Sequence, residues 1–171
     1  MAELKIRHEL NCTDDTFWNK IVFDPQDTFN RHLYHELLKF PKYQVTELKD
    51  EGTRMTRKVH IEPPVEGLPG PVKKALGDRL SYLEEDEFDK KTKRLIIKVT
   101  PSTLADKIRI NGEMYCEPLG ENKVARFANF TVEVKVFMVG GMIEEKIIAD
   151  LKKSYDTAAG ATNEWLKSQG L

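Results

Sequence analysis

The stretch FTVEVKVFMVGGMIEEKI, residues 130–147, changes its hydrophobic period in the middle. Valines alternate with charged residues as far as Val136, which indicates a strand with one buried face. After Gly140-Gly141 the apolar residues recur every three or four positions, which indicates a helix. The last strand therefore runs almost directly into a C-terminal helix, and this junction restricts the folds that the chain can adopt.

The helical pattern continues nearly to the end of the chain. Its apolar and small residues form one stripe: Ile143, Ile147, Leu151, Tyr155, Ala158, Thr162 and Trp165. A helix of about 25 residues is roughly 40 Å long and must lie across a whole sheet to bury such a stripe. We expect Gly140 and Gly141 to allow positive φ and close backbone approach where the chain bends into this helix.

The rest of the chain predicts a sheet of antiparallel strands. An alternating strand at 3–12 precedes two short helices that end before Pro41. Strand-like runs separated by turn signals then follow one another at 43–48, 53–62, 79–88, 94–100, 107–117 and 123–139. A proline-rich loop, 63–71, and a helical turn at 72–76 interrupt this series. Successive strands with short connections are typical of an antiparallel meander.

Length and composition exclude several classes of protein. The 171 residues suit one domain, 1–171, and the net charge of −1 does not predict a nucleic-acid surface. No run of about 20 apolar residues is present to span a membrane, and the charged, alternating N-terminus is not a signal peptide. Two cysteines, Cys12 and Cys116, lie in strand-like runs and are interpreted as small core residues in a reducing compartment. We therefore expect a cytoplasmic protein.

Two segments, ELKIRHELNCTDDTFWNKI and VEVKVFMVGGMIEEKIIADLKKSYDTAAGATNEWL, carry a resemblance to a known superfamily. The order of elements resembles the START-like helix-grip superfamily, also called SRPBCC, and most closely a bacterial START-like group of unknown function. PRELI-type lipid-transfer domains are also similar, at the stretch PPVEGLPGPVKKALG. The resemblance implies an α+β fold in which a curved antiparallel sheet of about seven strands wraps a long C-terminal helix, with two short helices after the first strand.

In such a fold a cavity lies between the sheet and the terminal helix, and we expect it to bind a hydrophobic small molecule or lipid. The expected ligand-binding residues are His8, Met55, Val59, Tyr82, Ile97, Ile110, Met114, Phe130, Val134, Leu151, Tyr155, Ala158 and Thr162. The polar groups expected to orient a ligand are those of His8, Tyr82, Tyr115 and Tyr155. The small residues 158–161 indicate either room for a ligand or tight helix–sheet packing.

Three polar features also have simpler interpretations. His8 lies on the apolar face of its strand, where a neighbouring group is expected to satisfy its hydrogen bonds. Arg57 and Arg126 share the parity of apolar neighbours and could hold an acidic head group, but we expect both to point outward. The charge-rich run 84–94 is expected to be a solvated hairpin.

No motif for metal or cofactor binding is present. His32 and His35 are three residues apart but have no third ligand, and neither cysteine has a nearby histidine to activate it. We therefore expect no metal, no cofactor and no catalytic residue that the sequence can name.

Three functions remain. A binding protein is favoured over an enzyme, although a polyketide cyclase or dehydratase could use the same cavity if it held a titratable pair. A lipid-transfer protein gated by the Pro63–Pro71 loop is the third, with transient membrane contact as an expected partner interaction. The sequence carries no signal for an oligomeric state.

Overall fold

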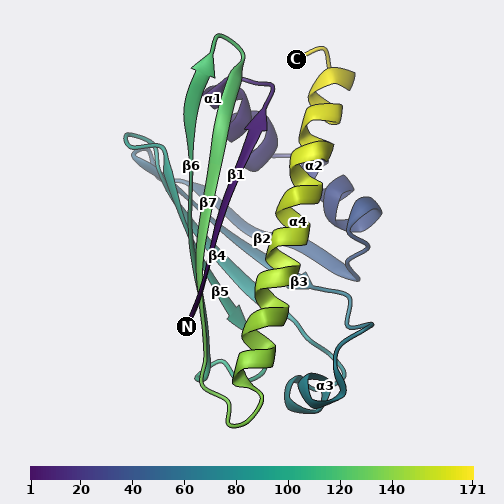
Figure 1. Ribbon diagram of the computed structural model, residues 1–171. Coiled ribbons are helices and arrows are strands. Elements are labelled where there is room, and N and C mark those ends of the chain that lie inside the picture. Colours follow the sequence, from purple (N-terminus) through teal and green to yellow (C-terminus); the bar gives the residue numbers. More distant parts are fainter.

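The computed structural model describes residues 1–171 and consists of one antiparallel sheet, a long terminal helix and short helical segments (Figure 1). The strands are β1 (Ala2–Leu10), β2 (Lys42–Asp50), β3 (Arg54–Glu62), β4 (Tyr82–Asp89), β5 (Arg94–Pro101), β6 (Ile108–Gly120) and β7 (Lys123–Val134). The helical segments are α1 (Asp14–Thr16), η1 (Phe17–Val22), α2 (Thr28–His32), η2 (Leu33–Leu37), α3 (Gly70–Leu76) and α4 (Gly140–Ser168), of which η1 and η2 are π-helical.

The sheet has the order β1-β7-β6-β5-β4-β3-β2, and every pair is antiparallel. From β2 to β7 each strand pairs with the next one in sequence, and β1 pairs with β7 as an edge strand of the sheet. The sheet curves, and α4 lies across its concave face (Figure 1). The predicted helix-grip architecture, with about seven strands and two short helical regions after β1, is confirmed.

At the junction between β7 and α4, one of the two glycines is required to avoid a steric clash. A Cβ added at Gly140 would lie 2.8 Å from the carbonyl oxygen of Val134, whereas one at Gly141 would meet nothing within 4 Å. Neither glycine has positive φ; that conformation is taken by Met138, with φ of 66°. Close backbone approach was therefore correctly predicted, but the positive φ was assigned to the wrong residue.

Helix α4 presents its predicted stripe to the sheet. Ile143 and Thr162 are fully buried, and the other stripe residues are buried or half-buried against the core. Gly160, by contrast, is exposed, and an added Cβ there would meet nothing within 4 Å. The interpretation of the whole run 158–161 as interior is therefore wrong at Gly160.

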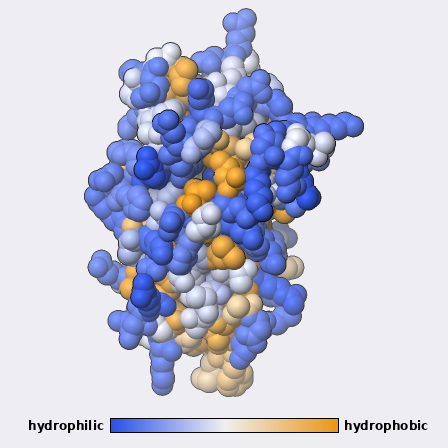
Figure 2. Space-filling view, turned by 180° about the vertical axis from the view of Figure 1, so that it is seen from behind, coloured by the Kyte–Doolittle hydropathy of each residue, from blue (hydrophilic) through white to orange (hydrophobic).

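The helical segments after β1 close one end of the sheet with aromatic side chains. Trp18 packs on Phe88 at 4.4 Å between ring centroids, and Phe17 lies edge-on to Trp18. Trp18 also donates a hydrogen bond from Nε1 to Asp14, at 2.8 Å, so its polar edge is satisfied. The surface of the molecule seen from behind is largely hydrophilic, with a group of apolar atoms near its middle (Figure 2).

No helix, α4 included, has both the length and the apolar character that a membrane span needs.

Candidate functional site

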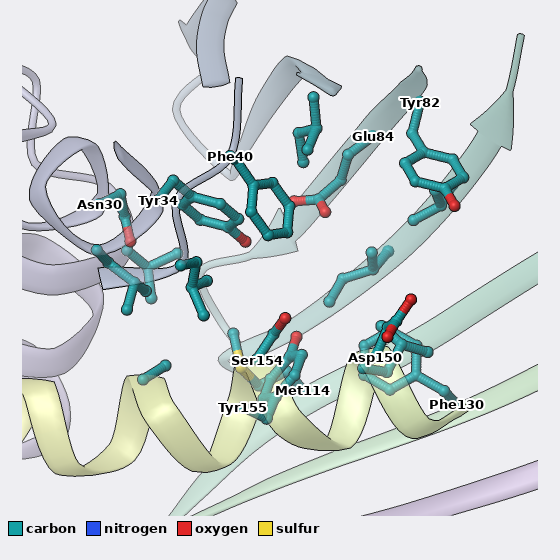
Figure 3. A pocket seen from close by; sticks show the side chains of 18 of the residues that line it. Asn30, Tyr34, Phe40, Tyr82, Glu84, Met114, Phe130, Asp150, Ser154 and Tyr155 are labelled. Carbon is teal, nitrogen blue, oxygen red and sulfur yellow. The ribbon is translucent and has the colours of Figure 1, made fainter. Parts of the chain in front are cut away.

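A cavity of about 190 Å³ lies on the concave side of the sheet, between strands β3 to β7, α4 and the helical segments η1, α2 and η2. It is lined by 28 residues, of which 20 are hydrophobic, so its wall is mainly apolar. Figure 3 shows Ser154 and Tyr155 of α4 directed toward the side of the cavity formed by Tyr34 and by β4, the strand that carries Tyr82 and Glu84. The site therefore combines residues from distant parts of the chain.

Nine of the thirteen residues predicted from the sequence line this cavity: Tyr82, Ile97, Ile110, Met114, Phe130, Leu151, Tyr155, Ala158 and Thr162. Their role as ligand contacts stays a prediction.

The remaining four, His8, Met55, Val59 and Val134, lie outside the cavity wall. Val59 is fully buried in a small separate cluster with Tyr43 and Ile61. Met55 and Val134 are half-buried against the edge of the main core.

Tyr115 is also outside the cavity. Its ring stacks on Phe127, and the guanidinium of Arg94 lies 4.3 Å from the ring centroid. It cannot orient a ligand held on the concave side.

Arg57 belongs to a buried ion cluster on the concave face, not to the solvent-exposed face where we expected it. Its Nη2 lies 2.7 Å from Oδ2 of Asp86 and 3.7 Å from Glu84, and its Nη1 donates to the carbonyl oxygen of Val22. Arg57 is 8% exposed and Asp86 is 3% exposed. The start of the 84–94 run is therefore buried, contrary to the prediction of a solvated hairpin.

The sequence contained a signal for this cluster. Glu84 and Asp86 share strand parity with Tyr82 and Phe88, which are apolar enough to mark the inward face. Arg57 and Asp86 are direct partners across β3 and β4. Opposite charges at facing positions of neighbouring strands would have indicated an internal pair.

Glu84 lines the cavity and differs from an ordinary surface carboxyl. Burial, reinforced by the negative charge of Asp86, raises the pKa of Glu84 to about 8, and Arg57 only partly offsets this effect. The raised pKa favours the protonated carboxyl near neutral pH, and a hydrogen bond with Asp86 contributes to this shift.

Arg126 is likewise inward, and is 4% exposed, contrary to the outward orientation that we expected. Its Nη2 donates to Nδ1 of His8 at 2.8 Å and to the carbonyl oxygen of Tyr155 at 3.2 Å. The guanidinium carbon lies 5.0 Å from the ring centroid of Tyr155. Burial lowers the pKa of Arg126 below its ordinary value.

His8 connects this arginine to the surface. Its Nε2 lies 2.8 Å from Oδ1 of Asp156 on α4. Because an arginine only donates, Nδ1 of His8 must accept, and Nε2 therefore carries the proton that it gives to Asp156. The prediction that neighbouring groups satisfy His8 is confirmed, and both of its ring nitrogens are occupied.

Three tyrosines, Tyr34, Tyr82 and Tyr155, line the cavity (Figure 3). Burial raises the pKa of each hydroxyl above its ordinary value. They remain protonated and are available as hydrogen-bond donors to a bound molecule.

The two cysteines are free, and neither lines the cavity. Burial raises the pKa of Cys12 to about 11 and that of Cys116 to about 12. Both thiols are therefore poor nucleophiles near neutral pH.

The proline-rich loop and α3 lie at the end of the molecule where α4 begins (Figure 1). Pro63 lines the cavity, whereas Val65 and Leu68 pack on the core. Pro63 is thus the one loop residue that reaches the cavity wall, and gating by the loop stays a prediction.

Comparison with known proteins places the chain in a family. A family model described as "Protein of unknown function (DUF2505)" matches residues 24–166. The chain belongs to the DUF2505 family. A search of curated proteins returned no match for this DUF2505 chain.

Solved structures show which fold the DUF2505 chain shares. The protein TTHA0849 from Thermus thermophilus is 15% identical, with a TM-score of 0.68 over 99% of this chain and 100% of that one. The Zhui aromatase/cyclase from Streptomyces sp. R1128 is 10% identical, with a TM-score of 0.65 over 99% and 96%. A START superfamily protein from Mycobacterium smegmatis is 12% identical, with a TM-score of 0.56 over 96% and 98%. The START-like fold is thereby confirmed, and at these identities the likeness concerns the fold alone.

Proposed function

We propose that this DUF2505 protein binds one compact, mainly apolar small molecule in the cavity between the curved sheet and α4. The observation that carries the proposal is an internal volume of about 190 Å³ with a predominantly hydrophobic wall. Burial of apolar surface, at roughly 25 cal/mol per Å², supplies the binding free energy. The hydroxyls of Tyr34, Tyr82 and Tyr155 provide the few polar contacts that orient a ligand.

The volume restricts the class of ligand. Sites for drug-sized ligands measure about 300–1,000 Å³, whereas an engineered apolar cavity of about 150 Å³ accepts benzene. A cavity of about 190 Å³ therefore favours a molecule with one or two fused rings, or a short chain, over a two-chain lipid.

Titration with 2-naphthamide, a neutral two-ring probe, tests the proposal by calorimetry. Ala158 lines the cavity, so Ala158→Leu should fill it and weaken binding at least tenfold. Ala149→Leu is the matched control because Ala149 lies on the exposed side of the same helix. Native mass spectrometry of the wild-type protein should also reveal small hydrophobic molecules that copurify. Equal affinity in wild type and Ala158→Leu would place the probe elsewhere and refute the proposal.

A second candidate function is proton-transfer catalysis in the same cavity. The observation that favours it is the position of Glu84 on the cavity wall, where burial raises its pKa to about 8, a value that suits a general acid or base near neutral pH. The His8–Asp156 pair meets the distance requirement, but both ring nitrogens of His8 are bonded to protein groups.

Deuterium exchange at the methyl group of 2-acetonaphthone, followed by NMR in D₂O, tests the catalytic candidate. Catalysis by Glu84 requires faster exchange with wild type than with Glu84→Gln. Exchange at the buffer rate in both samples would eliminate this candidate and leave the binding function intact.

A further inference from the structure

The charged side chains on the cavity wall are Arg57, Glu84, Arg126 and Asp150. Asp86 neutralises Arg57 from 2.7 Å, and Asp150 is paired with Lys146. Glu84 lies 3.7 Å from Nη2 of Arg57, and burial raises its pKa, which favours the uncharged form. Arg126 is thus the one charged group of this wall that has no opposite charge beside it.

The partners of Arg126 are all neutral. Its Nη2 contacts an imidazole nitrogen and a carbonyl oxygen, and Tyr155 supplies a ring face. Its Nε is buried and has no hydrogen-bond partner, and no protein group accepts from Nη1. A buried cation without a counter-ion is costly, and a bound anion would offset that cost.

The surroundings hold Arg126 in place without cancelling its charge. His8 accepts from Arg126 and is therefore neutral in this arrangement. Asp156, behind His8, is 45% exposed and is already paired with Lys152, so its charge is screened by solvent and by that lysine. Two contacts of Nη2 therefore fix the guanidinium, while the hydrogens of Nη1 have no protein acceptor.

We propose that the cavity selects compact apolar molecules that carry an anionic oxygen group, such as an aromatic or short-chain carboxylate, and that Arg126 binds this group. The inference rests on the proposed binding function and specifies the chemistry of its ligand. A carboxylate suits the site because its charge would neutralise the guanidinium and its oxygens can accept from Nη1, for which no protein group is an acceptor.

Three probes of equal ring size separate the alternatives in the wild-type protein: 2-naphthoate, neutral 2-naphthamide and cationic 2-naphthylmethylamine. Calorimetry at pH 7 should show 2-naphthoate binding at least tenfold more tightly than 2-naphthamide, the effect expected of a charge-assisted contact. Equal affinities, or tighter binding of the amine, would overturn the inference while leaving the binding function standing. Failure of all three probes to bind would overturn both.

A variant then assigns the preference to one side chain. Arg126→Met should reduce the ratio of naphthoate to naphthamide affinity to about one. Arg7→Met is the matched control, because Arg7 lies one residue from His8 on the exposed face of β1. An unchanged ratio in Arg126→Met would refute the role of Arg126. Should that variant not fold, the comparison of probes in the wild type still decides whether the cavity prefers an anion.

Discussion

Gly140 and Gly160 both lie in α4, but a methyl group would meet very different surroundings at these two positions. At Gly160 there is open space, so Gly160→Ala should raise the free energy of unfolding by about 0.5–1 kcal/mol through helix propensity. At Gly140 the new Cβ would lie 2.8 Å from the Val134 carbonyl oxygen, so Gly140→Ala should lower it by about 1–3 kcal/mol.

Urea denaturation of both variants beside the wild type measures these changes. Helix propensity alone would make alanine stabilising at both sites. The close contact at Gly140 should therefore reverse the sign of the change in the free energy of unfolding at that site. Stabilisation by Gly140→Ala would show that β7 and α4 do not approach as closely as the structure indicates.

Glu84 should make the stability of the protein depend on pH. Its folded-state pKa of about 8 exceeds its ordinary value of 4.5, so the folded state binds more protons between these pH values. The free energy of unfolding should therefore fall as pH rises from about 4.5 to about 8, by at most ~1.4 kcal/mol per pH unit. Urea denaturation at several pH values measures this slope.

Glu84→Gln should flatten that slope, because glutamine does not titrate. Glu85→Gln is the control, since Glu85 is the next residue of β4 and points to the other face of the sheet. A slope that persists in Glu84→Gln would assign the dependence to another group.

Single residues were the hardest features to predict from the sequence. Alternation gave Arg57 and Arg126 the parity of apolar neighbours, but a register shift of one residue at a bulge would turn either side chain outward, and Glu84 was assigned to a solvated hairpin. The missing information was the pairing across strands, which places Asp86 opposite Arg57 and His8 opposite Arg126. Parity within each strand indicated an inward face, but these partners can be matched only when the register between the strands is known.

At the scale of elements, the sequence was much more informative. The period of 3.6 residues in α4 and the alternation in the strands each extend over many residues, so single errors do not obscure them. The π-helical segments η1 and η2 could not be predicted, because their hydrogen-bond pattern depends on what the segments pack against.

The pairing of β6 with β7 places Gly112 opposite Phe130, which lines the cavity. An added Cβ at Gly112 would lie 2.4 Å from the Phe130 ring, at its flexible end. Gly112→Val should therefore lift the ring from the sheet toward Tyr155, whose ring centroid is 5.4 Å away, and narrow the cavity. Affinity for 2-naphthamide should fall at least tenfold in calorimetry, while the far-UV circular dichroism spectrum stays that of the wild type.

Gly141→Ala is the control for this substitution, because a Cβ there meets nothing within 4 Å. Unchanged probe affinity in folded Gly112→Val would mean that Phe130 does not form part of the binding wall.

At the scale of the whole molecule, one end carries two strongly exposed apolar side chains. The connection between β7 and α4 exposes Phe137 by 91% and Met138 by 85%, and α3 and the proline-rich loop lie at the same end (Figure 1). The expected membrane contact was assigned to the Pro63–Pro71 loop, but Val65 and Leu68 of that loop pack inward. Exposed apolar side chains at the β7–α4 connection are the better candidates for insertion into a bilayer.

Replacement of both exposed residues, Phe137→Ser with Met138→Ser, should therefore reduce cosedimentation with phosphatidylcholine vesicles at least tenfold, because two buried side chains contribute roughly 1.5–3 kcal/mol each. Ile96→Ser is the matched control, since Ile96 is 53% exposed on β5, where its side chain points to the face opposite the cavity. Equal cosedimentation of the double variant and the wild type would exclude this connection as the membrane contact.

Deletion of residues 64–68 tests the loop separately: if the loop gates the cavity, transfer of 2-naphthamide between vesicles should change while cosedimentation does not. A change in cosedimentation without a change in transfer would instead make the loop a membrane anchor. Ligand entry to the cavity would then not depend on the length of the loop.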